Sequence, residues 1–234
     1  MRVFTYTASY RKDSNTERII DLIINLIREK ESVIEYRHSA KCDHIHECIG
    51  CENCFKNGLC VLDKTDAMGK IKSELFDSDV ILLGSPVYAA MVSGNMKKLI
   101  DRLSYYLHTF FFRGKLIIPI LSASGNSLLD TNAYIKKIAE SWGGIVPFSI
   151  LFTVDAPNML EMPAFMQDVL PGYADEIIEY VVNGKKKRAS EYQEKYYLQL
   201  KRFYSLPGDD AERMYWRESG LLDYTSFQEV LDVD

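Results

Sequence analysis

The sequence has few cysteines, with 5 in 234 residues, and this density is too low for a disulfide scaffold. No apolar run approaches the roughly 18 residues that a membrane-spanning helix needs. The chain does not open on a positively charged segment followed by an apolar one, the pattern of a secretory signal. These absences argue against a disulfide-rich, secreted or membrane protein. We therefore expect a cytoplasmic protein with no membrane partner, in which thiols stay reduced.

The sequence also lacks an excess of basic residues, since its formal net charge is −5. A nucleic-acid partner would favour a basic face, so none is expected. The basic run at residues 185–188 follows Asn183 and Gly184, which favour a helix end, and we interpret it as a solvated connection between helices. No G-x-G-x-x-G motif follows an expected strand, so no Rossmann-type dinucleotide site is predicted.

Apolar strand patterns alternate with amphipathic helix patterns over the first two thirds of the chain. This alternation predicts a parallel sheet with helices on both faces. The expected strands are residues 1–7, 32–38, 79–84, 115–121 and 145–154. The expected helices between them are residues 14–30, 66–76, 94–107 and 131–142. Five strands predict a flavodoxin-like α/β fold with strand order 2-1-3-4-5. Pro119 lacks an N–H group, so we expect it near a strand end.

The pattern changes after about residue 155, where no further strand is evident. Residues 159–184 and 189–206 are expected helices, and a short amphipathic segment follows them. We therefore predict a ligand-binding domain over residues 1–155, with a cysteine-containing insertion at 42–62. Residues 156–234 form an α-helical extension of the same domain, packed on the sheet or on a partner chain.

Three loops follow strands at the carboxyl edge of the predicted sheet, where open α/β sheets bind ligands. The first is rich in hydroxyl groups and ends at a helix N-terminus, a favourable anion site, although a polar helix cap explains the same pattern. Its candidate residues are Ser9, Arg11, Ser14, Asn15 and Thr16. The second loop offers Tyr88 for stacking on a planar ring, and the third has small residues that permit close backbone approach. Their candidates are Ser85, Pro86, Val87 and Tyr88, then Ser122, Ala123, Ser124 and Gly125.

Four cysteines, Cys48, Cys51, Cys54 and Cys60, follow a C-x2-C-x2-C-x5-C pattern. The spacing suits the four thiolate ligands of a [4Fe–4S] cluster. Zinc is an alternative, because Cys42, His44 and His46 lie just upstream of Cys48 and offer tetrahedral ligands. A second alternative is a set of metal-free or redox-active thiols. Cys42 lies outside the compact motif and is interpreted as a spare thiol.

The loop residues carry a resemblance to a family. The patterns Ser9-x-Arg11-x-x-Ser14-Asn15-Thr16, 84–88 and 93–102 resemble the NAD(P)H-dependent FMN reductases and the tryptophan-repressor-binding-protein-like multimeric flavodoxins. With the cysteine motif, the chain also resembles the iron–sulfur flavoproteins. The match covers roughly residues 1–155. Ala8 departs from it, because the family commonly has Gly there.

This resemblance implies that the first loop holds the FMN phosphate and that the other two border the isoalloxazine ring. It further implies an oxidoreductase in which NAD(P)H stacks transiently on the flavin and no acid–base catalytic residue is needed. A quinone, a free flavin or a ferredoxin is the expected acceptor or donor. We also expect a homodimer or homotetramer, because the aromatic residues 105–112 and the tail offer apolar surface. The alternatives are a pure electron-transfer carrier and a zinc-stabilised binding protein.

Overall fold

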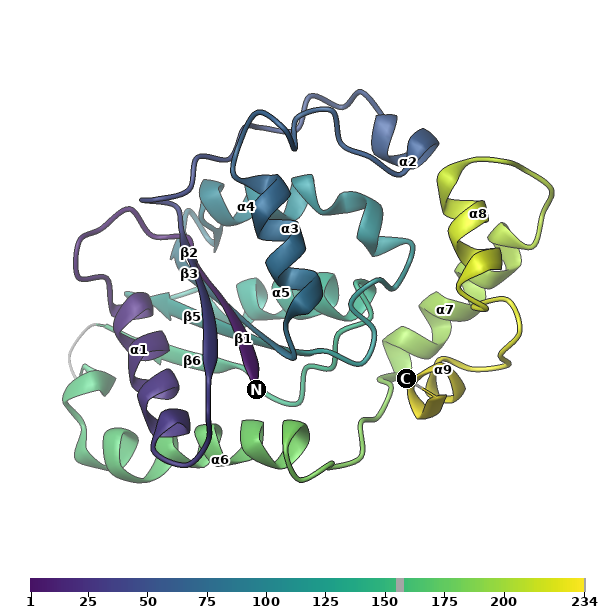
Figure 1. The fold of residues 1–234 in the computed structure, drawn as a ribbon. Coiled ribbons are helices and arrows are strands. Elements are labelled where there is room, and N and C mark those ends of the chain that lie inside the picture. The colour runs from purple at the N-terminus through teal and green to yellow at the C-terminus, as the bar shows by residue number, and fades with distance from the viewer. Residues whose placement is uncertain (155–157, 234) are drawn as a thin grey trace.

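A central parallel sheet with helices on both faces forms the core of the molecule (Figure 1). The computed structural model describes residues 1–154 and 158–233. Its parallel strands are β1 (Arg2–Thr7), β2 (Ile34–Ser39), β3 (Val80–Tyr88), β5 (Leu116–Ala123) and β6 (Ile150–Thr153). They lie in the order β2-β1-β3-β5-β6. Numbered as parallel strands alone, this is the predicted order 2-1-3-4-5, so the flavodoxin-like fold is confirmed.

Alternate residues of the central strands face two separate apolar cores, because side chains of a strand alternate between faces. Val80 and Leu82 of β3 pack with one set of helices, and Ile81 and Leu83 pack with the other. The first set is α1 (Asn15–Arg28) and α6 (Leu170–Val181). The second set is α3 (Met68–Asp77), α4 (Gly94–Arg102) and α5 (Leu128–Ser141). Burial on both faces explains the continuous apolar run of β3.

Several element boundaries differ from those predicted. β3 extends to Tyr88 and turns into a short antiparallel strand, β4 (Met91–Val92), which was not expected. The helix predicted over residues 94–107 ends at Arg102 and is followed by a 3-10 turn, η1 (Ser104–Leu107). The strand predicted over residues 145–154 is shorter, because only Ile145 makes an isolated bridge before β6 begins.

Pro119 lies in the middle of β5, opposite Leu83 of β3, so its expected place near a strand end is wrong. The N–H of Ile117 and the C=O of Lys115 bond to Ile145 on the β6 side. The two-residue alternation along a strand places the Pro119 nitrogen on that same side. The facing residues 146–149 belong to no strand, so the missing donor leaves no ladder bond unmade.

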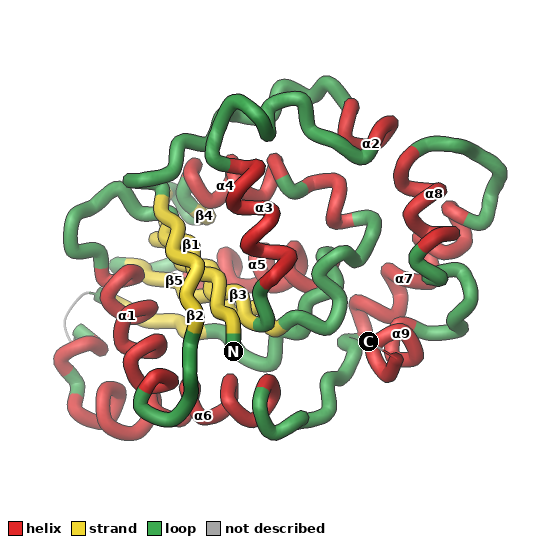
Figure 2. Tube along the Cα trace, in the orientation of Figure 1, coloured by secondary structure: helices red, strands yellow, loops and turns green. Residues whose placement is uncertain are grey.

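The C-terminal extension is helical, as predicted, but it is divided into more pieces. Short 3-10 and π-helical turns, η2 (Met159–Glu161) and η3 (Phe165–Val169), precede α6. α7 (Glu191–Tyr204), α8 (Ala211–Glu218) and α9 (Phe227–Val233) follow at the side of the sheet (Figures 1 and 2). The predicted domain boundary at residues 155 and 156 lies outside the described residues. Within the described residues, the helices are too short or too polar to cross a membrane.

Candidate functional site

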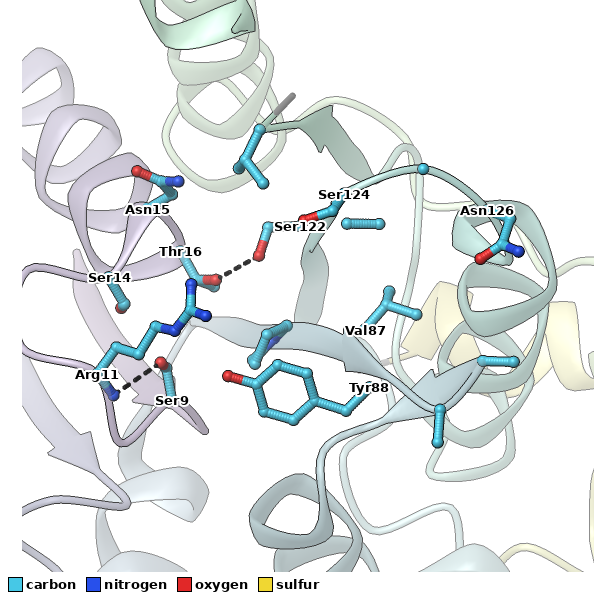
Figure 3. Close-up of a pocket in the computed structure, with 16 residues that line it drawn as sticks. Ser9, Arg11, Ser14, Asn15, Thr16, Val87, Tyr88, Ser122, Ser124 and Asn126 are labelled. Atoms are coloured by element: carbon cyan, nitrogen blue, oxygen red, sulfur yellow. Dashed lines mark hydrogen bonds between the residues drawn. The ribbon is translucent and has the colours of Figure 1, made fainter. Parts of the chain in front are cut away.

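A pocket of about 690 Å³ opens at the carboxyl ends of β1, β3 and β5 (Figure 3). Its size is typical of a site for a cofactor-sized ligand. All the residues predicted from the three loops line it, with Ser85 as the exception. The sheet therefore brings together three loops that are separate in sequence, the first and third of them about a hundred residues apart, as the switch-point rule for open sheets requires.

The first loop ends at the N-terminus of α1, which faces this pocket. The Ser14 hydroxyl accepts a hydrogen bond from the Glu17 N–H at 3.2 Å and so caps the helix. The Ser9 hydroxyl accepts a bond from the Arg11 N–H at 3.2 Å, and the Arg11 side chain lines the pocket (Figure 3). Helix N–H groups, hydroxyls and one guanidinium form a site suited to a phosphate.

The first and third loops are joined across the pocket floor. The Thr16 and Ser122 hydroxyl oxygens lie 3.0 Å apart and are hydrogen-bonded (Figure 3). Thr16 lies in the first turn of α1 and Ser122 lies near the end of β5. This bond fixes the helix N-terminus relative to the sheet, so both loops keep a defined position around a ligand.

The second loop is a β-hairpin whose turn residues are Ala89 and Ala90. Their φ angles are 48° and 65°, in the left-handed region that favours glycine. The adjacent Tyr88 is 47% exposed beside the pocket. The hairpin thus holds an aromatic ring at the pocket edge at the cost of local backbone strain.

Ala90→Gly is expected to raise the free energy of unfolding by about 0.5–1 kcal/mol. Glycine removes a left-handed penalty of about 1–2 kcal/mol per residue, offset in part by its larger unfolded-state entropy. Urea unfolding measures the change. Ala133→Gly is the control, because Ala133 is exposed inside α5, where the same substitution should destabilise by about 1 kcal/mol. A destabilised Ala90→Gly protein would contradict the strain assignment.

Ser85, which was predicted to bind the cofactor, does not line the pocket. It is fully buried in β3, and its hydroxyl accepts a hydrogen bond from the Ser93 N–H at 3.1 Å. Ser93 in turn caps α4 and donates to the Ala8 carbonyl. Because side chains alternate along β3, the Ser85 side chain faces the protein interior, where its hydrogen bond with Ser93 stabilises the hairpin.

Four further residues line the pocket that were not among the candidates: Ala89, Ala90, Asn126 and Val154. Asn126 directly follows the small-residue run of the third loop, and Val154 follows β6 at the same sheet edge. Both residues follow a strand at the carboxyl edge of the sheet, which is the criterion that identified the other loop residues. The sequence does not indicate the two alanines in the same way, because an Ala-Ala pair is not a typical sequence for such a turn.

The four motif cysteines line one cavity of about 60 Å³. Cys48 and Cys51 are exposed, whereas Cys54 and Cys60 are partly buried. Burial raises the pKa of the Cys54 thiol, and the nearby Cys60 and Cys48 raise it further. Four thiols around one cavity are the donor set of an iron–sulfur cluster. In the described part of the chain, however, no three Cys, His, Asp or Glu side chains are grouped closely enough to hold a metal ion.

The two histidines of the alternative zinc site, His44 and His46, do not line the cysteine cavity. The rings of His44 and His46 pack edge to face with centroids 4.6 Å apart. They line a different cavity, which none of the cysteines lines. Cys42 is exposed and lines neither. The structure therefore does not bring the mixed His and Cys set around one cavity.

A buried arginine fixes the segment that carries the cysteines. The Arg102 side chain is fully buried and donates to the His46 carbonyl at 3.0 Å, to Asp63 at 2.8 Å and to Asp66. Burial alone would lower the pKa of Arg102, but the bonds to Asp66 and Asp63 outweigh it and raise that pKa. The cysteine motif lies between these anchor points. Sequence reasoning gave Arg102 no role, since the ion pair joins residues far apart in the chain.

Both candidate sites lie near α4. Ser93, its N-cap, contacts the hairpin that borders the large pocket, and Ser104, just beyond its last residue, lines the cysteine cavity. The two cavities share no lining residue.

The aromatic segment predicted to form a subunit contact is largely packed within the chain. Tyr105, Tyr106, Phe110 and Phe112 are buried. Phe110 packs against Trp216 of α8, and Phe112 packs against Trp142. The extension and α5 therefore cover the surface on which the oligomer prediction partly depended.

The model of the NADPH-dependent FMN reductase family matches residues 1–157. An iron–sulfur flavoprotein of Archaeoglobus fulgidus is 30% identical over 148 residues, which is 63% of this chain and 66% of that protein. The chain thus spans slightly less than two thirds of this relative. Among solved structures, an apo NADH:FMN oxidoreductase matches with a TM-score of 0.57 and 15% identity, covering 80% of this chain and 94% of that one.

A WrbA-like flavodoxin from Agrobacterium tumefaciens matches with a TM-score of 0.51 and 16% identity, over 79% of this chain and 98% of that one. These structural matches support the fold alone. The family match covers well over half of the sequence and includes all three pocket loops. The chain therefore belongs to the NADPH-dependent FMN reductase family.

Proposed function

We propose that this protein is an FMN-binding oxidoreductase that exchanges electrons between FMN and a [4Fe–4S] cluster. The observation that carries the proposal is the large pocket, where an open helix N-terminus, hydroxyl groups and Arg11 converge at the carboxyl edge of the sheet. The family match and the similarity to iron–sulfur flavoproteins support it. NAD(P)H is the proposed electron donor, and a quinone, a free flavin or a ferredoxin is the proposed partner.

The pocket residues have separate tasks in this proposal. Ser9, Arg11, Ser14, Asn15 and Thr16 hold the FMN phosphate through hydroxyl, guanidinium and backbone donors. The hairpin at Pro86, Val87 and Tyr88 and the loop at 122–125 border the isoalloxazine ring. FMN, when bound, supplies the hydride and single-electron chemistry. The protein orients the ring and leaves one edge accessible to a transient donor, so no acid–base residue is assigned.

Cys48, Cys51, Cys54 and Cys60 are the proposed cluster ligands. They line a single cavity, and Arg102 anchors the segment on both sides of them, through a hydrogen bond to the His46 carbonyl and an ion pair with Asp63. Ligation requires thiolates, so metal binding must displace protons from these thiols. Cys48 and Cys51 are exposed, which leaves the cavity open on one side for electron exchange with a partner.

Arg11→Ala is expected to weaken FMN binding by about 1–3 kcal/mol, because it removes a charge-assisted contact with the phosphate. Fluorescence titration of flavin-free protein with FMN measures the change. Lys12→Ala is the matched control, because this neighbouring cation is exposed and does not line the pocket. Riboflavin, which lacks the phosphate, should bind weakly to both variants and to the unsubstituted protein.

Two results would contradict the proposal. One is an Arg11→Ala protein with unchanged FMN affinity and no preference for FMN over riboflavin. The other is preferential binding of FAD, whose second phosphate and adenosine the pocket is not proposed to hold.

A further inference from the structure

α8 of the C-terminal extension lies against α2 (Asn53–Asn57) of the cysteine segment (Figures 1 and 2). A Cβ atom added at Gly58, just after α2, would lie 3.7 Å from the Cβ of Ala211. Ala211 is buried, and its carbonyl accepts a hydrogen bond from the Tyr105 hydroxyl at 3.4 Å. α8 lies beyond the residues that match the family model, so this contact is a feature of the extension.

A chain of side-chain contacts links α8 to the cysteine cavity. Glu212 of α8 bonds to the His108 Nδ1 at 2.7 Å. The His108 ring stacks on Phe55 with centroids 5.7 Å apart, and Phe55 lines the cavity beside Cys54. Glu212 is itself held by the Tyr204 hydroxyl at 2.8 Å.

α8 is firmly anchored, so it is able to serve as a support. Trp216 is fully buried and donates from its indole N–H to the His108 carbonyl at 2.8 Å. Its ring stacks with Tyr197 and Tyr204 of α7. His108 is therefore held by both its ring and its backbone.

α2 needs such a support. It has five residues, none of them buried, and its N-cap residue Glu52 has a left-handed backbone and makes no capping bond with its side chain. A single helical turn is not stable in isolation, because the cost of helix nucleation is not recovered. Its position, and with it the position of Cys54, must come from tertiary contacts.

We propose that the C-terminal extension positions the cysteine centre, with Glu212 acting through His108 and Phe55 to hold Cys54 in the cavity. The metal-related part of this inference rests on the proposed function, whereas the positioning of the thiol does not. Glu212 is a positioning residue and contacts no electron carrier.

Glu212→Ala is expected to increase the alkylation rate of Cys54 by about tenfold, because local opening of α2 becomes more frequent. Metal-free protein is treated with iodoacetamide, and peptide mass spectrometry gives the rate at each cysteine. The exposed Cys42 serves as the internal reference. Glu212→Gln keeps one acceptor oxygen, for either Tyr204 or His108, so it should give a smaller increase.

Glu194→Ala is the matched control. Glu194 accepts bonds from the Phe227 and Gln228 N–H groups, both at 2.8 Å, so its loss weakens the extension without touching α2. A Cys54 rate that rises in Glu212→Ala but not in Glu194→Ala supports the proposal. Equal rates in all proteins, or equal increases in both alanine variants, would overturn it.

The same variants test the positioning role of Glu212 independently of whether the cysteines bind a cluster. After anaerobic reconstitution with iron and sulfide, Glu212→Ala should lose its visible cluster absorbance several-fold faster than Glu194→Ala, since outer contacts of a metal site alter its affinity. If no protein binds iron while the Cys54 rates differ as expected, the cluster proposal fails and the positioning role stands.

Discussion

Cys54→Ser is expected to reduce the iron bound per chain after anaerobic reconstitution to about a tenth or less of the unsubstituted level, since the four thiolates hold a cluster jointly. Cys54 is partly buried and lines the cysteine cavity. A serine hydroxyl is a much poorer ligand for iron than a thiolate. Iron and acid-labile sulfide per chain, with the visible spectrum, measure the loss.

Cys42→Ser is the matched control, because Cys42 is exposed and lies outside the cysteine cavity. It should bind as much iron as the unsubstituted protein. About one zinc per chain in anaerobic preparations would contradict the cluster and favour the zinc alternative. A metal-free protein with unchanged activity after reconstitution would leave the cysteines as free or redox-active thiols.

The FMN content of Cys54→Ser should stay unchanged. The cysteine cavity and the large pocket share no lining residue. Loss of a metal from the cysteine cavity therefore alters no side chain that lines the FMN pocket.

The strand order and the large pocket were predictable from sequence because both depend on local patterns. Apolar runs identify buried strands, and the carboxyl ends of neighbouring parallel strands meet at one edge regardless of the loops' sequence separation. Ser14 and Ser122 were therefore assigned to one site, and the structure brings them to one pocket. Ser85 was misassigned because a loop motif does not reveal which way each side chain points.

Features that depend on tertiary contacts were not predictable in the same way. The spacing of the cysteines gives no direction for the segment, which runs from the end of β2 toward α8 (Figure 1). The buried pairs of Arg102 with Asp63 and Asp66 join residues more than thirty positions apart. The contact of Glu212 with His108 spans 104 positions. A local sequence pattern does not predict contacts between residues so far apart in the chain.

Gly84→Ala is expected to lower FMN affinity by at least about tenfold, which is about 1.4 kcal/mol, and to destabilise the fold by about 1–3 kcal/mol. A Cβ atom at this position of β3 would lie 2.7 Å from the Thr16 Cγ2 and 2.9 Å from the Ile20 Cδ1. Both distances are too short, so the Thr16 and Ile20 side chains must rotate or the first turns of α1 must move away from the sheet. Either response disturbs the bond between Thr16 and Ser122, which fixes the helix N-terminus proposed to hold the phosphate.

Gly172→Ala is the control that distinguishes the effect of the Gly84→Ala clash with α1 from a general effect of replacing glycine. Gly172 is exposed in α6, and a Cβ atom there would have no neighbour within 4 Å, so alanine should leave FMN affinity unchanged and raise stability slightly. Fluorescence titration with FMN and urea unfolding are measured for both variants. If Gly84→Ala were destabilised but bound FMN as tightly as the unsubstituted protein, the N-terminus of α1 would not be the phosphate site. Because Gly84 itself does not line the pocket, a loss of affinity in Gly84→Ala acts through Thr16 or through the position of α1.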